Sequence, residues 1–158
     1  MGSATQAHQR ATDGFDDAVG RRLGLNPTDL RCLDWLSERG MSAGELGAAT
    51  GLSSAATTTM LDRLERKGYV GRERDTVDRR KVLVEMTADG RARIDDLYGP
   101  LAEAGARLLA RFSDDELAKL RDFLLKATDV VDRHQARVRG SLVGGRPSRA
   151  KGADETSA

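Results

Sequence analysis

The stretch that decides the fold runs from residue 52 to residue 84 and reads LSSAATTTMLDRLERKGYVGRERDTVDRRKVLV. Its first half predicts a helix that begins at Ser53 or Ser54 and ends at Lys67, before Gly68, because glycine commonly stops a helix at its carboxyl end. The first turn carries small hydroxyl residues and no acid, so this end of the helix can approach phosphates without repelling them. Apolar spacing defines a narrow core face, which consists of Thr57, Met60, Leu61 and Leu64.

Two runs of β-branched and aromatic residues follow this helix and predict an antiparallel hairpin. The runs are Tyr69-Val70 and Val82-Leu83-Val84, and residues 75–80 form a polar loop between them. We call the segment 69–84 the wing. A helix that is followed by a basic hairpin indicates a protein that binds duplex DNA.

Residues 42–67 have the plan of a helix-turn-helix motif. Ser42 and Glu45 form a capping-box pattern that starts a short helix, and a turn around Gly51 separates it from the longer helix. In such motifs the second helix enters the major groove, where threonine methyls and alanine can touch thymine methyl groups and arginine can reach guanine or phosphate. The residues expected to contact DNA lie opposite the core face or at its edge: Ser53, Ser54, Ala55, Thr58, Thr59 and Arg63.

The wing supplies the second predicted DNA contact. Arg79 and Arg80 stand at its tip, where guanidinium groups can enter a narrow, electronegative minor groove, and Arg74 adds positive charge before the loop. Asp78 is expected to hold one of these arginines in position by a bidentate ion pair. The alternative is a charged hairpin that serves only solubility.

Helices are predicted on both sides of a DNA-binding lobe that spans residues 25–86. Residues 4–24 form an alanine-rich N-terminal helix, and residues 87–138 form two C-terminal helices, of which the first is kinked or weakened at Gly99-Pro100. Residues 139–158 are rich in glycine, serine and arginine and predict a disordered tail. The last helix carries an apolar seam that is too long for the lobe to cover, so a second copy of the chain is the expected partner. The seam consists of Leu117, Leu120, Leu124, Ala127, Val131 and His134.

Composition narrows the class of protein. The chain has 158 residues, of which 32% are charged and 4% aromatic, so we expect a mainly α fold with an aliphatic core. Cys32 is the only cysteine, which excludes an intramolecular disulfide. No apolar run approaches membrane-spanning length and no signal-peptide pattern is present, so we expect a cytoplasmic protein that does not enter a membrane. The sequence has no nucleophile elbow, phosphate-binding loop or metal motif, so we expect neither an enzyme nor a bound cofactor or metal.

Several of these segments resemble the MarR family of bacterial winged helix-turn-helix transcription regulators. The resemblance covers roughly residues 5–137 and implies a homodimer whose N- and C-terminal helices interlock, with two lobes that straddle a pseudo-palindromic operator in double-stranded DNA. It implies repression that is relieved by a small ligand or an oxidant. It also implies that Asp78 and Arg80 stabilise and present the wing, while residues 53–63 enter the major groove. The matching segments are LGAATGLS at 46–53, DRLERKGYV at 62–70, RERD at 72–75, DRR at 78–80 and MTADGR at 86–91.

The sequence leaves the sensing function open between alternatives. A candidate pocket for a small-molecule effector comprises Phe15, Leu30, Cys32 and Trp35, although each of these residues also suits a place in the core. Cys32 has a second alternative role as a redox-sensing thiol, which requires an exposed thiolate beside cations. A winged-helix module that docks proteins instead of DNA is a further alternative.

Overall fold

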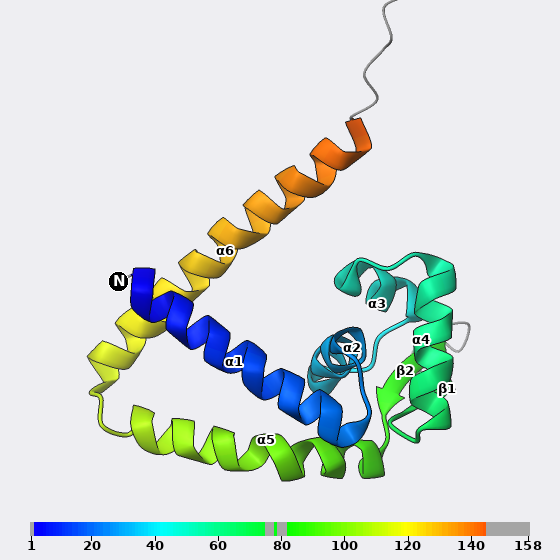
Figure 1. Ribbon diagram of the computed structural model, residues 1–158, viewed down its shortest axis with the longest axis horizontal. Coiled ribbons are helices and arrows are strands. Elements are labelled where there is room, and N and C mark those ends of the chain that lie inside the picture. Colours follow the sequence, from blue (N-terminus) through cyan, green and yellow to red (C-terminus); the bar gives the residue numbers. More distant parts are fainter. Residues whose placement is uncertain (1, 75–77, 79–81, 145–158) are drawn as a thin grey trace, which may run out of the picture. The chain divides into compact units, whose positions relative to one another are not determined.

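The computed structural model describes residues 2–74, 78 and 82–144, and within them the chain forms six helices and one two-stranded sheet (Figure 1). The fold is mainly α with a small β hairpin, as the sequence predicts. The chain divides into two compact units, Met1–Ala104 and Gly105–Ala158. In chain order the elements are α1 (Gly2–Leu23), α2 (Pro27–Glu38), α3 (Ala43–Thr50), α4 (Ser54–Arg66), β1 (Val70–Arg74), β2 (Val82–Met86), α5 (Ala88–Leu109) and α6 (Asp114–Gly144).

Side-chain caps set the limits of the short helices. The Asn26 side chain accepts a hydrogen bond from the backbone N–H of Asp29, whose carboxylate accepts one from the N–H of Asn26 at 3.2 Å. Ser42 and Glu45 form the predicted capping box at the start of α3. Gly51 ends α3 with a φ of 75°, a left-handed conformation that glycine adopts at little cost. These caps satisfy backbone groups that the helices leave without partners, and they fix the turn between α3 and α4.

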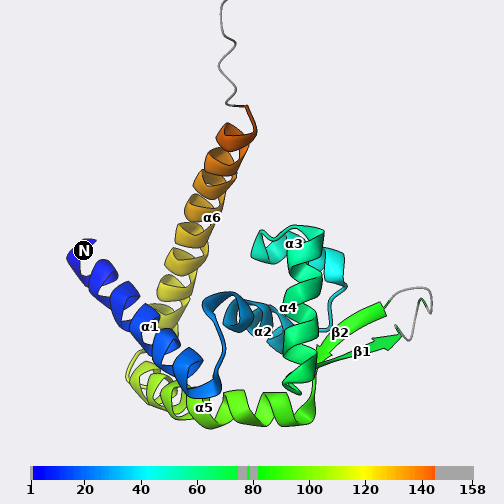
Figure 2. The ribbon, with the colours of Figure 1, turned by 45° about the vertical axis from the view of Figure 1, so that its right-hand side comes forward.

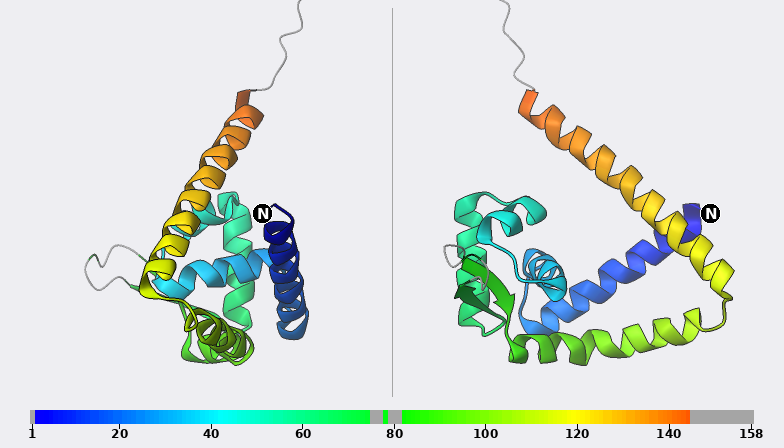
Figure 3. Two further views of the ribbon diagram at one scale, coloured as in Figure 1. Left: turned by 90° about the vertical axis from the view of Figure 1, so that its left-hand side faces the viewer. Right: turned by 180° about the vertical axis from the view of Figure 1, so that it is seen from behind.

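The core of the first unit lies where α2, α3, α4 and the hairpin meet. The predicted core face of α4 is confirmed, because all four of its residues are at most 2% exposed. Figure 3 shows α2 between α1 and the hairpin, and α2 contributes three side chains to the core. Burial of this apolar surface holds α4 in place, at roughly 25 cal/mol for each Å² removed from water. The core cluster consists of Leu25, Cys32, Leu33, Leu36, Met41, Leu46, Met60, Leu61, Leu64, Tyr69, Val70 and Val84.

The hairpin extends further than the apolar runs of the sequence indicate. Strands β1 and β2 are antiparallel, with Val70 opposite Met86, and Figure 2 shows them projecting away from α4. Met41, between α2 and α3, adds an isolated bridge to Val84, with N···O distances of 3.1 and 2.8 Å in the two directions. This bridge attaches the middle of the hairpin to the segment between α2 and α3.

The start of α5 is attached to the end of α4. The Thr87 Oγ1 atom accepts a hydrogen bond from the N–H of Gly90 at 2.9 Å, and the Thr87 hydroxyl donates to the Gly68 carbonyl oxygen at 2.6 Å. Gly90 packs so closely that a Cβ atom there would lie 2.4 Å from the carbonyl oxygen of Tyr69. The helix continues through Pro100 as a single element, so the predicted weak point does not end it.

Helix α6 begins after the second predicted capping box, which Ser113 and Glu116 form. The helix ends at Gly144, beyond the predicted helix end at residue 138, and the predicted disordered tail stays a prediction. Each residue added to an existing helix makes one further backbone hydrogen bond, which favours continuation of the helix through residues 139–144. The seam is largely open to solvent in the single chain, with exposed fractions of 40% for Leu120, 54% for Leu124 and 64% for Val131.

Candidate nucleic-acid interface and ligand cavity

The amino end of α4 presents small side chains and backbone N–H groups to solvent. Ser53 caps the helix, and its Oγ accepts a hydrogen bond from the N–H of Ala56 at 3.3 Å. Ser54 and Ala55 follow in the first turn, which is exposed and contains no acidic residue. The partial positive charge at this end of a helix favours an anion, and the geometry suits a DNA phosphate.

Two exposed threonines continue this surface along α4. The hydroxyl of Thr58 donates to the carbonyl oxygen of Ser54 at 3.1 Å, and that of Thr59 donates to the carbonyl oxygen of Ala55 at 3.0 Å. Because each hydroxyl proton is used within the helix, the threonines offer acceptor oxygens and methyl groups to a partner. In a major groove these groups match the amino groups of adenine or cytosine and the methyl group of thymine.

Arg63 is only partly exposed and pairs with an acid of another helix, so its predicted contact with DNA stays a prediction. Its guanidinium pairs with the Asp29 carboxylate on α2, with Nη2–Oδ1 and Nε–Oδ2 distances of 2.5 and 3.2 Å. The Asp29 side chain is only 1% exposed, and the Arg63 side chain is 30% exposed. The hydrogen bond to Asp29 raises the pKa of Arg63. Arg63 therefore joins α4 to α2. This role could not be predicted from the sequence, because Asp29 lies 34 residues before Arg63.

A second ion-pair cluster, which sequence reasoning missed, joins β1 to the exposed face of α4. Arg72 Nη2 lies 2.6 Å from Asp62 Oδ1, and Arg72 Nη1 lies 2.9 Å from Glu65 Oε2. The hydrogen bond to Asp62 raises the pKa of Arg72. The sequence signal that could have indicated this cluster is the pair Asp62 and Glu65, which are three residues apart and therefore share one helix face. The pairing partly neutralises two carboxylates on a helix that is expected to approach a polyanion.

The wing tip lies outside the described residues. Arg79 and Arg80 belong to that segment, so their predicted contacts with DNA stay predictions. Asp78 is half-buried, and Arg74 is exposed at the end of β1, opposite Val82. The described part of the wing therefore places Arg74 at its outer end.

The arrangement of an exposed second helix followed by a hairpin is shared with known proteins. The sequence profile of the MarR family matches residues 25–82. The HTH-type transcriptional regulator YcgE of Bacillus subtilis is 41% identical over 126 residues, which are 79% of this chain and 82% of YcgE. The chain belongs to the MarR family.

Other MarR-family comparisons agree with this assignment. Wild-type MarR from E. coli, in its apo form, matches 80% of this chain and 96% of its own length with a TM-score of 0.54 and 25% identity. The HTH-type transcriptional repressor YetL of Bacillus subtilis is 35% identical over 77 residues, 48% of this chain and 46% of YetL. The protein is a MarR-family DNA-binding transcriptional regulator, and these relatives are named as regulators, not enzymes. No helix in the part of the chain that the structure describes is long and apolar enough to cross a membrane.

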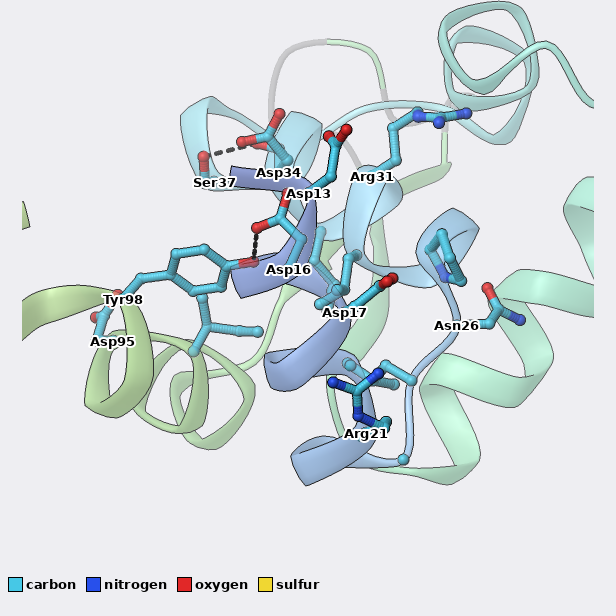
Figure 4. A pocket seen from close by; sticks show the side chains of 17 residues that line it. Asp13, Asp16, Asp17, Arg21, Asn26, Arg31, Asp34, Ser37, Asp95 and Tyr98 are labelled. Carbon is cyan, nitrogen blue, oxygen red and sulfur yellow. Dashed lines mark hydrogen bonds between the residues drawn. The ribbon is translucent and has the colours of Figure 1, made fainter. Parts of the chain in front are cut away.

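This MarR-family chain has a cavity of about 1100 Å³ that is bounded by α1, α2 and α5 of the first unit (Figure 4). Of the four predicted pocket residues only Leu30 lines it. Cys32 is fully buried in the core, Trp35 is 42% exposed, and Phe15 packs edge-on against Tyr98 with ring centroids 5.3 Å apart. These three residues do not line this cavity, in which polar side chains form much of the lining, and their place in an effector pocket stays a prediction.

The cavity contains a hydrogen bond between α1 and α5. The Tyr98 hydroxyl donates to Asp16 Oδ1 at 2.7 Å, and burial together with this hydrogen bond raises the pKa of Tyr98 (Figure 4). Asp34 of α2 also lines the cavity, and its pKa is raised by burial and then by the nearby charges of Glu38 and Asp16. The cavity is thus a region of concentrated negative charge.

The redox-sensing alternative requires a reactive thiol, and the structure of this MarR-family chain does not provide one. The Cys32 side chain is completely buried, and burial followed by the Asp29 charge raises its pKa to about 12. A thiol in this environment stays protonated near neutral pH and is a poor nucleophile. We therefore do not retain Cys32 as a sensor.

Proposed function

We propose that the protein acts as a homodimeric repressor that binds a pseudo-palindromic operator in double-stranded DNA and is released by a small ligand. The observation that carries the DNA-binding part is the surface of α4. Its amino end has free polar groups and no acid, and Thr58 and Thr59 offer acceptors and methyl groups one turn further along. This surface has the dimensions and chemistry of a helix that reads a major groove.

Residues of the wing are proposed as the second contact. Arg74 stands at the outer end of β1, and Arg79 and Arg80 follow in the sequence, with Asp78 to orient one of them. Insertion of these cations into a minor groove would add affinity without reading many bases. The repressor part of the proposal is supported by YetL, which is named as a transcriptional repressor.

The proposed dimer is supported by the exposed seam of α6. Leu124 and Val131 are 54% and 64% exposed in the single chain, and Leu120 lies one turn before them. A continuous apolar row of this length on one helix is typically covered by another helix. Leu124→Asp is therefore expected to convert the dimer to a monomer in analytical ultracentrifugation. Ala118→Asp adds the same charge on the opposite side of α6 and should leave the dimer intact.

The experiment that tests the proposed function is footprinting on the DNA upstream of the protein's own gene. We expect protection of two half-sites about one helical turn, ~10 bp, apart. Affinity should fall steeply with salt, because several phosphate contacts per lobe release counterions. The double variant Arg79→Ala/Arg80→Ala should lose most of this affinity. A flat salt response, together with unchanged binding by the double variant, would favour a module that docks proteins.

A further inference from the structure

The inner half of the hairpin is fixed to the core, whereas its outer half projects away from it (Figure 2). Val70 of β1 is buried, and Val84, which lies opposite Arg72, forms the bridge to Met41. Beyond this level the paired strands are exposed or partly exposed up to Arg74 at the end of β1. A two-stranded hairpin is only marginally stable by itself in water, so its direction depends on further contacts with the lobe.

Arg72 provides a polar link between β1 and α4. Its two terminal nitrogens bind different acids: Nη2 lies 2.6 Å from Asp62 Oδ1, and Nη1 lies 2.9 Å from Glu65 Oε2. Among the described residues of β1, only Arg72 makes a side-chain hydrogen bond or ion pair to α4. Because the guanidinium is planar and its nitrogens are fixed relative to one another, two such bonds define an orientation as well as a distance.

The three side chains of this link are too exposed for it to serve mainly stability. Their exposed fractions are 39% for Arg72, 51% for Asp62 and 40% for Glu65. Exposed ion pairs contribute little to the free energy of unfolding, because water and salt screen both charges. The acids are also unfavourable for binding a polyanion, since Asp62 lies four residues after Thr58 on the face that is expected to approach phosphates. What the link contributes is a fixed position of β1 on α4.

We propose that Arg72 is a positioning residue of the DNA interface. By binding Asp62 and Glu65 together it fixes β1 relative to α4, so that one lobe contacts the major groove through α4 and the minor groove through the wing at the same time. Arg74 lies on the same face of β1, two residues and about 7 Å beyond Arg72, and its place depends on this link. The inference rests on the proposed function, because it requires both α4 and the wing to contact DNA.

Loss of the link should reduce discrimination between DNA sequences more than general affinity for DNA. Attraction to phosphates depends on charge and not on base sequence, whereas contacts with the bases require both elements in their correct places. We expect the ratio of operator affinity to non-specific affinity to fall about tenfold, which is the level of one lost base contact.

The test measures this ratio for the full chain by fluorescence anisotropy. The operator probe is the duplex that the parent protein selects from a random-sequence pool, and the second probe is the same duplex with its bases in scrambled order. Arg72→Lys keeps the charge but lacks the planar fork that binds both acids, so the ratio should fall about tenfold while affinity for the scrambled duplex changes by less than about twofold. Arg39→Lys alters an exposed ion pair with Glu45 that involves neither β1 nor α4, and this matched control should keep the parent ratio.

The double variant Asp62→Ala/Glu65→Ala breaks the same link from the side of α4. It should bind the scrambled duplex more tightly than the parent protein does, because two negative charges are removed, and its ratio should nevertheless fall about tenfold. The triple variant with Arg72→Lys should have a ratio no lower than either, because the same link is lost only once. In all of these variants Tm should stay within about 4 °C of the parent value.

A parent-level ratio in Arg72→Lys or in the double variant would overturn the proposal. So would an Arg72→Gln variant that weakens both duplexes equally and lowers the salt slope by about one, with parent-like binding by Arg72→Lys, because Arg72 would then contact a phosphate itself. A loss of Tm by more than about 10 °C in both Arg72→Lys and the double variant would show a structural role instead. Failure of the parent protein to select any duplex refutes the proposed function together with this inference, whereas selection followed by unchanged ratios in the variants refutes the positioning role alone.

Discussion

The two partners of the ion pair between Asp29 and Arg63 are expected to contribute unequally to stability, because their burial differs. In Arg63→Met the apolar stem stays, but the guanidinium is removed from a carboxylate that is 1% exposed. Among the residues that the structure describes, the remaining donor to the Asp29 carboxylate is then the N–H of Asn26. An uncompensated buried charge typically costs about 3–5 kcal/mol. For a domain of this size that loss lowers Tm by roughly 6–20 °C.

Two further variants, Asp29→Asn and the double variant, separate the effect of the buried charge from the loss of the ion pair. Asp29→Asn leaves an arginine that is 30% exposed and can reach water, so we expect a smaller loss of about 1–2 kcal/mol. In the double variant Asp29→Asn/Arg63→Met no buried charge remains, and it should be more stable than Arg63→Met alone. Urea denaturation followed by circular dichroism measures the three values, at one protomer concentration because association contributes to stability.

The reasoning would be refuted by an Arg63→Met variant whose free energy of unfolding lies within about 1 kcal/mol of the parent protein, since that is the level of an exposed pair. A double variant as unstable as Arg63→Met would also refute it. Either result would mean that the carboxylate is hydrated and does not depend on Arg63 for its charge partner.

Three other substitutions or reactions probe separate parts of the structure. Gly90→Ala should lower the free energy of unfolding by about 1–3 kcal/mol, because the new Cβ atom would lie 2.4 Å from a backbone carbonyl oxygen. Gly99→Ala on the same helix is the control: its Cβ atom would meet nothing within 4 Å, and stability should be unchanged or higher by up to about 1 kcal/mol. Urea denaturation measures both variants. The Cys32 thiol, with its pKa near 12, should react with a thiol reagent at pH 8 about a thousandfold more slowly than in the urea-unfolded chain, and equal rates would contradict its burial. Hydrogen bonds lower the pKa of Glu45, and the largest effect comes from the backbone N–H of Ser42. The ionised Glu45 carboxylate therefore stabilises the fold above the ordinary pKa of a glutamate, and this stabilisation is lost as the pH falls through the pKa of Glu45 in the folded protein. Glu45→Gln should therefore lower Tm at pH 7, and the difference should shrink as the pH falls to 3; a difference independent of pH would argue against the capping role.

Local signals explain why most of the fold could be predicted from the sequence. The capping boxes at Ser42 and Ser113 and the stop at Gly51 each depend on residues within three or four positions, and all of them are present in the structure. The apolar face of α4 was predictable for the same reason, because helical periodicity is a short-range property. The end of α6 was not, because the glycine-rich composition after residue 138 predicts an earlier end, whereas the helix continues to Gly144.

The features of the candidate site that the sequence did not predict arise from contacts between distant segments. Arg63 had the position of a DNA contact at the edge of α4, and only the packing of α2 on α4 shows that Asp29 binds it. The cavity has the same origin, because its acidic end combines α1 and α2, and its Tyr98 comes from α5. A single sequence does not show which helix surfaces face one another, so apolar character alone pointed to Trp35, which is 42% exposed.

The most direct test of the central claim, that the amino end of α4 contacts DNA, is the operator affinity of Ser54→Glu. A glutamate in the first turn of a helix stabilises the helix by about 0.3–1 kcal/mol, so Tm should be unchanged or higher. The same carboxylate would face phosphates, and fluorescence anisotropy should show affinity lower by about tenfold or more. Ala88→Glu places the same charge in the first turn of α5, beside the opposite end of α4, and should bind like the parent protein. Parent-level affinity of Ser54→Glu would contradict the account.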